Sequence, residues 1–262
     1  MTILDKIVEK KKIEVAEAKT KVSLTELEQY PLFNRTCYSL KDSILHPQRT
    51  GIIAEFKRAS PSKGLINGTS SVQDVVKGYQ DAGASAISVL TDPDFFQGSL
   101  ADITAAREVL TIPLLRKEFI VDRYQIAEAK AYGADIILLI AACLSPEEIE
   151  EFSSYAKSLG LNVLLEVHNE EELVANIFDT IDAIGVNNRN LKDFTVSLDH
   201  SYDLVNKIPN SYIKVSESGI SDPQTIKDLK RKGFDSFLIG ENFMKTADPA
   251  TAIKEFVALI NA

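Results

Sequence analysis

An acid and a base share one face of an apolar segment at residues 52–56, where the segment gives way to a polar loop. Side chains alternate between the two faces of a strand, so Glu55 and Lys57 point the same way, with Ile53 below them. Residues 60–64 then supply hydroxyl groups and turn-forming residues. This arrangement predicts a catalytic site at the carboxyl end of a barrel strand.

Polar side chains recur where other apolar runs end. By the same alternation rule, we expect the inward-facing set to include Lys117, Glu166, Asn187 and Glu217, with Arg189 just beyond. Burying several charges without a ligand is costly unless they pair closely, so the set predicts a pocket. Mixed signs suit proton transfer, because neighbouring charges move pKa values toward neutrality, and the lysines suit an anionic substrate.

Two glycine-containing loops near the end of the chain predict a phosphate site. Ser218 and Gly219 follow the apolar run at 212–216, and Gly240 and Glu241 follow the run at 235–239. In α/β barrels the loops after the seventh and eighth strands often bind phosphate through backbone N–H groups. We expect Ser60 to add a hydroxyl group from the first loop.

Eight short apolar runs predict the strands that position these residues. Amphipathic stretches separate most of the runs, and several of these end in glycine, which is typical of a helix C-terminus. Alternating strands and helices indicate a parallel sheet, and eight such units favour a closed (β/α)8 TIM barrel. The runs lie near residues 52–56, 86–90, 112–116, 135–140, 161–166, 182–186, 212–216 and 235–239.

The chain is expected to form a single α/β domain over residues 1–262. Residues 1–49 are rich in charge and follow helical spacing, so we interpret them as an N-terminal helical extension and residues 50–262 as the barrel. No strand–GxGxxG–helix unit is present, which argues against a dinucleotide-binding fold.

The composition of the chain limits the kinds of partner that it can bind. The net charge of -9 argues against nucleic acid or an anionic membrane as the main partner, but a small anion responds to the local field of its site. No apolar run reaches the length of a membrane span, and we expect a cytoplasmic monomer.

The two cysteines lack the spacing of a metal site, and we expect no metal ion there. We interpret the three histidines, His46, His168 and His200, as structural.

Nearly the whole chain resembles the indole-3-glycerol phosphate synthase family. The most specific motif is Glu-Phe-Lys-Arg-Ala-Ser-Pro-Ser-Lys-Gly at 55–64, and the loops after the last two strands are shared with other phosphate-binding barrels. Phe56, Glu118 and Asn242 depart from the residues common in the family, but none is an expected catalytic side chain. Further motifs lie at 3–8, 90–99, 115–122, 165–168, 184–191, 215–220 and 238–244.

The resemblance implies a lyase of tryptophan biosynthesis that acts on 1-(2-carboxyphenylamino)-1-deoxyribulose 5-phosphate. The reaction closes a pyrrole ring with loss of carbon dioxide and water, and it implies no metal and no organic cofactor. An aryl carbon attacks a ketone, so the carbonyl oxygen needs a proton donor, and Lys117 resembles the family's general acid. Glu166 and Lys57 are the candidates for the later acid and base, with the division between them open.

The remaining candidates position the substrate. Asn187 and Glu55 are expected to orient the catalytic groups, and Lys57 to hold the anthranilate carboxylate as well. Glu217 is expected to hold substrate hydroxyls, and Arg189 to support the carboxylate end. The slot for the benzene ring is expected to consist of Phe95, Phe119 and Leu191.

Two other functions remain open from the sequence. A Schiff-base aldolase would use a barrel lysine as its nucleophile, and Lys117 is suitably placed. Borohydride trapping with a sugar phosphate would reveal the covalent adduct of such an aldolase. A non-catalytic ligand-binding barrel is the other alternative, although a scaffold has no need of the acid–base set.

Overall fold

Eight parallel strands close into a barrel, which confirms the predicted fold. The computed structural model describes residues 3–190 and 194–262. Around the barrel the strands run in the order β1-β10-β9-β8-β7-β6-β5-β4, and β4 pairs with β1 to close it. The strands are β1 (Ile52–Phe56), β4 (Ala86–Leu90), β5 (Leu114–Lys117), β6 (Ile136–Ile140), β7 (Asn162–Val167), β8 (Ala183–Asn187), β9 (Ile213–Glu217) and β10 (Ser236–Ile239).

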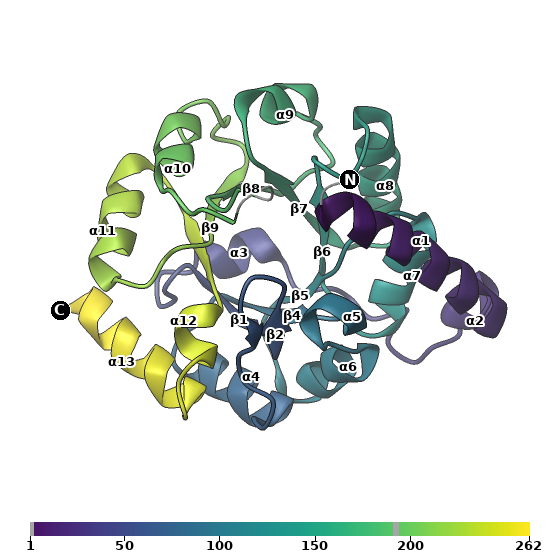
Figure 1. The fold of residues 1–262 in the computed structure, drawn as a ribbon, viewed down its shortest axis with the longest axis horizontal. Helices are drawn as coiled ribbons and strands as arrows, with labels where there is room; N and C mark the ends of the chain where they lie inside the picture. Colours follow the sequence, from purple (N-terminus) through teal and green to yellow (C-terminus); the bar gives the residue numbers. More distant parts are fainter. Residues whose placement is uncertain (1–2, 191–193) are drawn as a thin grey trace.

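Helices surround the barrel (Figure 1). Most begin at a Ser, Asp or Asn whose side chain accepts a backbone N–H of the first turn. No helix in the described ranges combines the length and apolar character needed to cross a membrane. The outer helices are α4 (Val72–Asp81), α6 (Leu100–Val109), α7 (Arg123–Ala131), α8 (Pro146–Ser158), α9 (Glu170–Ala175), α10 (Asp199–Leu204), α11 (Pro223–Lys232) and α13 (Pro249–Asn261).

Short elements elaborate the loops at the carboxyl ends of the strands. The β2 (Ala59–Ser60) and β3 (Gly64–Leu65) hairpin follows β1, α5 (Pro93–Phe96) follows β4, and α12 (Glu241–Met244) follows β10. Both α10, with six residues, and α12, with four, are short. These elements shape the mouth of the barrel.

Alternation along the strands separates two apolar layers. Side chains such as Ile53, Leu115 and Leu164 fill the barrel interior. Their neighbours, such as Ala54 and Leu114, face outward and pack against the helices. Each strand is therefore apolar on both faces, as expected of a parallel sheet covered by helices.

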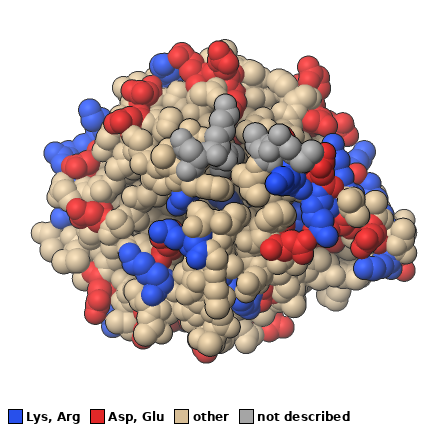
Figure 2. Space-filling view, in the orientation of Figure 1, with Lys and Arg blue, Asp and Glu red and all other residues tan. Residues whose placement is uncertain are grey.

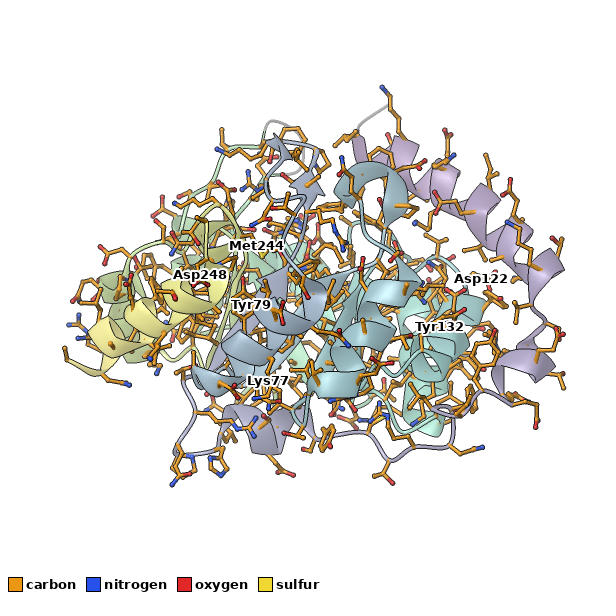
Figure 3. The ribbon with its side chains drawn as sticks, turned by 90° about the horizontal axis from the view of Figure 1, so that it is seen from below. Lys77, Tyr79, Asp122, Tyr132, Met244 and Asp248 are labelled. Atoms are coloured by element: carbon orange, nitrogen blue, oxygen red, sulfur yellow. The ribbon has the colours of Figure 1, made fainter. Side chains whose placement is uncertain are left out.

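Three helices precede the barrel, and they cover both of its ends. From α3 (Leu40–Ile44), Leu40 and Ile44 join the apolar cluster of the barrel interior. By contrast α1 (Ile3–Lys21), which is followed by α2 (Leu24–Leu27), lies across α7 (Figure 1). Lys19 of α1 donates to Asp122 Oδ2 at 2.6 Å, at the labelled start of α7 (Figure 3).

The short helix α12 is held against α4. Tyr79 of α4 is fully buried, and its hydroxyl lies 3.2 Å from Met244 Sδ. Figure 3 shows the two labelled side chains beside each other. The Tyr79 ring also packs against Phe243, with ring centroids 5.8 Å apart. These contacts fix the loop that leaves β10, which is one of the two predicted phosphate loops.

A buried lysine anchors α1 to the barrel. Lys11 is only 3% exposed, and its ammonium group lies 2.6 Å from Glu14, 2.8 Å from Asp92 and 3.0 Å from Glu118. Burial alone would lower the pKa of Lys11, but the carboxylates of Glu118 and Asp92 outweigh that effect and raise it. Because Glu118 follows β5 and Asp92 follows β4, this one cation ties α1 to two strand ends.

We expect Lys11→Met to lower the free energy of unfolding by about 3 kcal/mol, because two buried carboxylates, Asp92 and Glu118, lose an ammonium group within 3.0 Å and Glu118 keeps only the more distant Arg116 at 3.9 Å. Urea denaturation would measure the loss. Lys12→Met is the matched control, since Lys12 is exposed and should cost well under 1 kcal/mol. Equal midpoints for the two variants would contradict the anchoring role.

Candidate active site

A cavity of about 670 Å³ opens at the carboxyl ends of the strands. Figure 2 shows Lys and Arg side chains gathered around the hollow in the centre of this face. Most of the side chains predicted from the sequence line it. They are Glu55, Lys57, Ser60, Lys117, Phe119, Glu166, Asn187, Arg189, Glu217, Ser218, Gly219, Gly240 and Glu241.

The predicted apolar slot needs one correction. Phe96 lines the cavity rather than Phe95, and its ring centroid lies 6.1 Å from that of Phe119. The cause is α5, in which adjacent side chains point about 100° apart, so only one of the two phenylalanines faces the cavity. Leu191, the third predicted member, lies outside the described residues.

Ion pairs connect the charged side chains of the cavity. The Lys117 ammonium group lies 2.7 Å from Glu217 Oε2 and 3.5 Å from Glu166 Oε2. Lys57 pairs with Glu55 at 2.8 Å. The Asn187 amide donates to Glu166 Oε1 at 2.9 Å. Two other strands, β5 through Lys117 and β8 through Asn187, therefore contact the carboxylate of Glu166, which lies near the end of β7.

These contacts fix the charge states that the cavity favours. Burial alone would lower the pKa of Lys117, but the carboxylates of Glu217, Glu166 and Glu55 outweigh it and raise the pKa. Burial alone would raise the pKa of Glu55, but the ammonium groups of Lys57 and Lys117 lower it on balance. For Glu217 burial dominates over Lys117, and its pKa rises to about 7. The cavity thus combines a charged ammonium donor with a carboxyl group that holds a proton near neutral pH.

Two glycines provide the space in which the buried carboxylates lie. A Cβ atom added to Gly185 of β8 would overlap Glu217 Oε1, and one added to Gly240 would overlap the side chain of Glu55. Gly185 pairs with Glu166 across the β7–β8 ladder, so the same glycine adjoins two carboxylate-bearing strands. Any larger residue at either position would displace an acid of the cavity.

The predicted phosphate loops adjoin each other because β9 pairs with β10. Ser218 and Gly219 have φ values of 70° and 77°, so the chain turns sharply as it leaves β9. For a serine this left-handed conformation is strained, and such strain is commonly found at binding sites. Ser60 lines the cavity from the loop after β1, the strand that pairs with β10 on its other side.

Several lining residues were missed by the sequence analysis. Lys63 and Lys245 add cations at the rim, and Lys63 lies 3.6 Å from the Glu241 carboxylate. Neither lysine has a local sequence signal, because a loop lysine resembles any exposed lysine. Apolar lining also comes from α1 and from strand ends, through Ile3, Leu4, Ile7, Leu90, Leu138 and Ile140.

The helical spacing of Leu4 and Ile7 was visible in the sequence, but which surface it covers was not. In the structure both residues line the cavity, so α1 supplies part of the wall. Within residues 3–190 and 194–262, no group of three or more His, Cys, Asp or Glu side chains is arranged to hold a metal ion.

Comparison with known protein families finds one family that matches nearly the whole chain. A family model for indole-3-glycerol phosphate synthase matches residues 4–256. The indole-3-glycerol phosphate synthase of Bacteroides thetaiotaomicron is 45% identical over 258 residues, and the match covers 98% of each chain. The enzyme of the same name from Sulfurimonas denitrificans is 43% identical over 258 residues, covering 97% of each chain.

Solved structures with the same barrel are more distant in sequence. A 3-hexulose-6-phosphate synthase from Salmonella typhimurium has a TM-score of 0.60 at 16% identity, covering 81% of this chain and 99% of that chain. A chain of the tryptophan synthase complex from Pyrococcus furiosus has a TM-score of 0.61 at 17% identity, covering 82% and 98%. At such identities the likeness shows the fold alone.

We expect Gly185→Ala to lower kcat at least tenfold, because the added methyl group displaces the Glu217 carboxylate from its place beside Lys117. Overpacking of this kind costs about 1–3 kcal/mol, so the variant should remain folded, which thermal denaturation would check. Gly68→Ala is the control, since its added Cβ meets only the exposed side chain of Leu65. Wild-type kcat in Gly185→Ala would contradict this account of the cavity.

Glu217 makes stability depend on pH. Its pKa in the folded protein, about 7, lies above the ordinary 4.5, so the folded state binds this proton more tightly than the unfolded state. The free energy of unfolding therefore falls as pH rises from about 4.5 through 7, by about 3 kcal/mol in full. The Glu217→Gln variant has no carboxyl group to titrate at this position, so it lacks this pH-dependent part of the free energy of unfolding. Urea denaturation at pH 5 and pH 8 should show a larger decrease for wild type than for the variant, and equal decreases would refute the assignment.

Proposed function

The chain belongs to the indole-3-glycerol phosphate synthase family, and we propose that it closes the indole ring of 1-(2-carboxyphenylamino)-1-deoxyribulose 5-phosphate. It is an enzyme of the carboxy-lyase class in tryptophan biosynthesis. The observation that carries the proposed mechanism is the Lys117 ammonium group, held by Glu217 and Glu166 in the same cavity as an aromatic slot.

Lys117 serves as the general acid of ring closure. The aryl carbon that bears the carboxylate attacks the ketone carbon, and the carbonyl oxygen takes a proton as the new carbon–carbon bond forms. The raised pKa of Lys117 keeps its ammonium group charged, so a proton is available for that oxygen. Loss of carbon dioxide then returns the bonding electrons to the ring.

Loss of water requires a second acid and a base, and the contacts support one division of these roles. Glu166 accepts from the Asn187 amide on Oε1 and faces the Lys117 ammonium on Oε2, so both of its oxygens face donors. We assign Glu166 as the base that takes the aniline or ring proton. Lys57, paired with the ionised Glu55, is then the donor to the departing hydroxyl group.

The ends of the substrate fit the two sides of the cavity. The benzene ring packs against the apolar wall formed by Phe96 and Phe119, and Lys57 holds the carboxylate until it leaves. Glu217 binds the hydroxyl groups of the substrate, and Arg189 supports its carboxylate end. The phosphate is bound by the loops after β9 and β10, together with Ser60 and the rim lysines.

The contacts argue against a Schiff-base aldolase. A lysine nucleophile must lose its proton, and this is favoured by an apolar or cationic environment. Lys117 instead lies beside two carboxylates that raise its pKa. Borohydride trapping with a sugar phosphate would therefore leave Lys117 unmodified. The sequence-based expectations of one domain, a monomer and a cytoplasmic location stay predictions.

Purified wild-type protein should convert the anilino-deoxyribulose phosphate to a product with indole fluorescence. The chain has no tryptophan, so its own emission does not obscure the signal. We expect Lys117→Met to lower kcat about 100-fold or more while a substrate analogue still binds within about an order of magnitude.

Lys12→Met, an exposed lysine replaced in the same way, is the control and should retain wild-type turnover. Absence of indole emission from folded wild-type protein would reject the proposed function. Equal losses of binding and turnover in Lys117→Met would show that Lys117 binds substrate rather than donating a proton.

A further inference from the structure

His168 lies behind the carboxylate of Glu166, outside the cavity. It follows β7, two residues after Glu166, and its ring is not part of the cavity lining. The sequence analysis interpreted His168 as structural, and the residue is absent from the cavity lining. That interpretation missed the contact: His168 Nε2 lies 3.5 Å from Glu166 Oε1, and it is buried without a hydrogen-bond partner among the described residues.

The other ring nitrogen also faces a carboxylate. His168 Nδ1 lies 3.4 Å from Glu172 Oε2, and the same oxygen accepts the backbone N–H of His168 at 2.8 Å. Glu172 Oε1 accepts from the side chain of Asn169 at 2.9 Å. Asn169 in turn caps the first turn of α9. The Glu172 carboxylate is therefore fixed, and it holds the imidazole in one orientation.

Only the imidazolium form satisfies both neighbours. A neutral imidazole has one N–H donor and one lone pair, so one of its nitrogens would direct a lone pair at a carboxylate that can only accept. The side chain is 15% exposed, which leaves little access to water. The protonated ring, by contrast, presents a donor to Glu166 and a donor to Glu172.

The charges around the ring favour that form. Burial alone would lower the pKa of His168, but Glu172 and Glu166, with a smaller effect of Glu217, outweigh it and raise the pKa. Cys143, beyond β6, adjoins the same acids, and burial raises the pKa of its thiol to about 12, so it stays neutral. The surroundings of the ring therefore carry excess negative charge.

We propose that His168, oriented by Glu172, is a positioning residue that holds the Glu166 carboxylate ready to act as the base. The inference rests on the function proposed above. Three groups then restrain Glu166: Asn187 at 2.9 Å and His168 at 3.5 Å on Oε1, and Lys117 at 3.5 Å on Oε2. Asn187 and Lys117 line the cavity, whereas His168 contacts Glu166 without being part of the lining. Distances of this length in a free enzyme can shorten when substrate binds.

The test compares steady-state kinetics of His168→Asn with those of wild type, using indole fluorescence across pH. We expect kcat to fall about tenfold with KM within about twofold, because His168 touches Glu166 and not the substrate. Wild-type kcat should also fall as pH rises through the pKa of His168, where the cation is lost. That alkaline limb should be missing in His168→Asn. Glu217 also titrates, with a pKa raised to about 7, but it is retained in the variant, so the lost limb belongs to His168.

Glu172→Gln provides a second test that keeps the histidine. Loss of this carboxylate removes the main influence that raises the His168 pKa, so the alkaline limb should move to lower pH. The double variant should be no slower than His168→Asn alone, because the two residues act through one contact. If His168→Asn does not fold, the pH profile of Glu172→Gln decides the question.

His200→Asn is the matched control, since His200 is exposed on α10 and should leave kcat and the pH profile unchanged. Wild-type kcat with an unchanged alkaline limb in His168→Asn would overturn the inference. So would a lower melting temperature as the sole effect, since that indicates a purely structural histidine. Absence of product from wild-type protein would instead reject the proposed function itself.

Discussion

Mutual neutralisation of charge at the mouth of the barrel is the constraint on which the rest of the structure depends. Glu55, Glu166 and Glu217 are buried, and the ammonium groups of Lys57 and Lys117 lie among them. Removing such groups from water costs several kcal/mol each unless close partners compensate. Burial raises the pKa of Glu217 to about 7, and the one negative charge by which three acids exceed two cations adds to this tendency to keep a proton. Each ionised group is thereby held in a defined place before substrate arrives, and such preorganisation favours charge development in a transition state.

Features elsewhere in the barrel and its loops hold this cluster of charges in place or complete the cavity around it. Gly185 and Gly240 leave the space that buried carboxylates need. Lys11 fixes α1 so that its apolar side chains close one wall of the cavity, and it pairs with Glu118, the residue next to Lys117. The Tyr79–Met244 contact fixes the loop after β10. Rigid strands carry the acids and bases, and the loops and α1 complete the binding surface, a division that suits precise placement of reacting groups.

The barrel alone does not specify the reaction. Solved structures with TM-scores of 0.60 and 0.61 at 16% and 17% identity share the fold with this chain. The chemistry of this chain lies in the side chains at its strand ends, and the chain as a whole is 41–45% identical to members of the family over nearly its full length. Because strand ends point into one cavity whatever the loops do, different side chains there support different chemistry on the same frame.

The sequence by itself determined the barrel, because alternating apolar runs and amphipathic stretches are local patterns that only a parallel, helix-covered sheet satisfies. It also determined which strand-end side chains face inward, since that follows from a period of two. Tertiary structure alone decided which charges pair: Lys117 meets Glu217, 100 residues away, and no local pattern encodes such a contact. Likewise Phe96 replaced Phe95 in the cavity wall, and His168 proved to contact Glu166, because the orientation of a short helix or loop depends on packing.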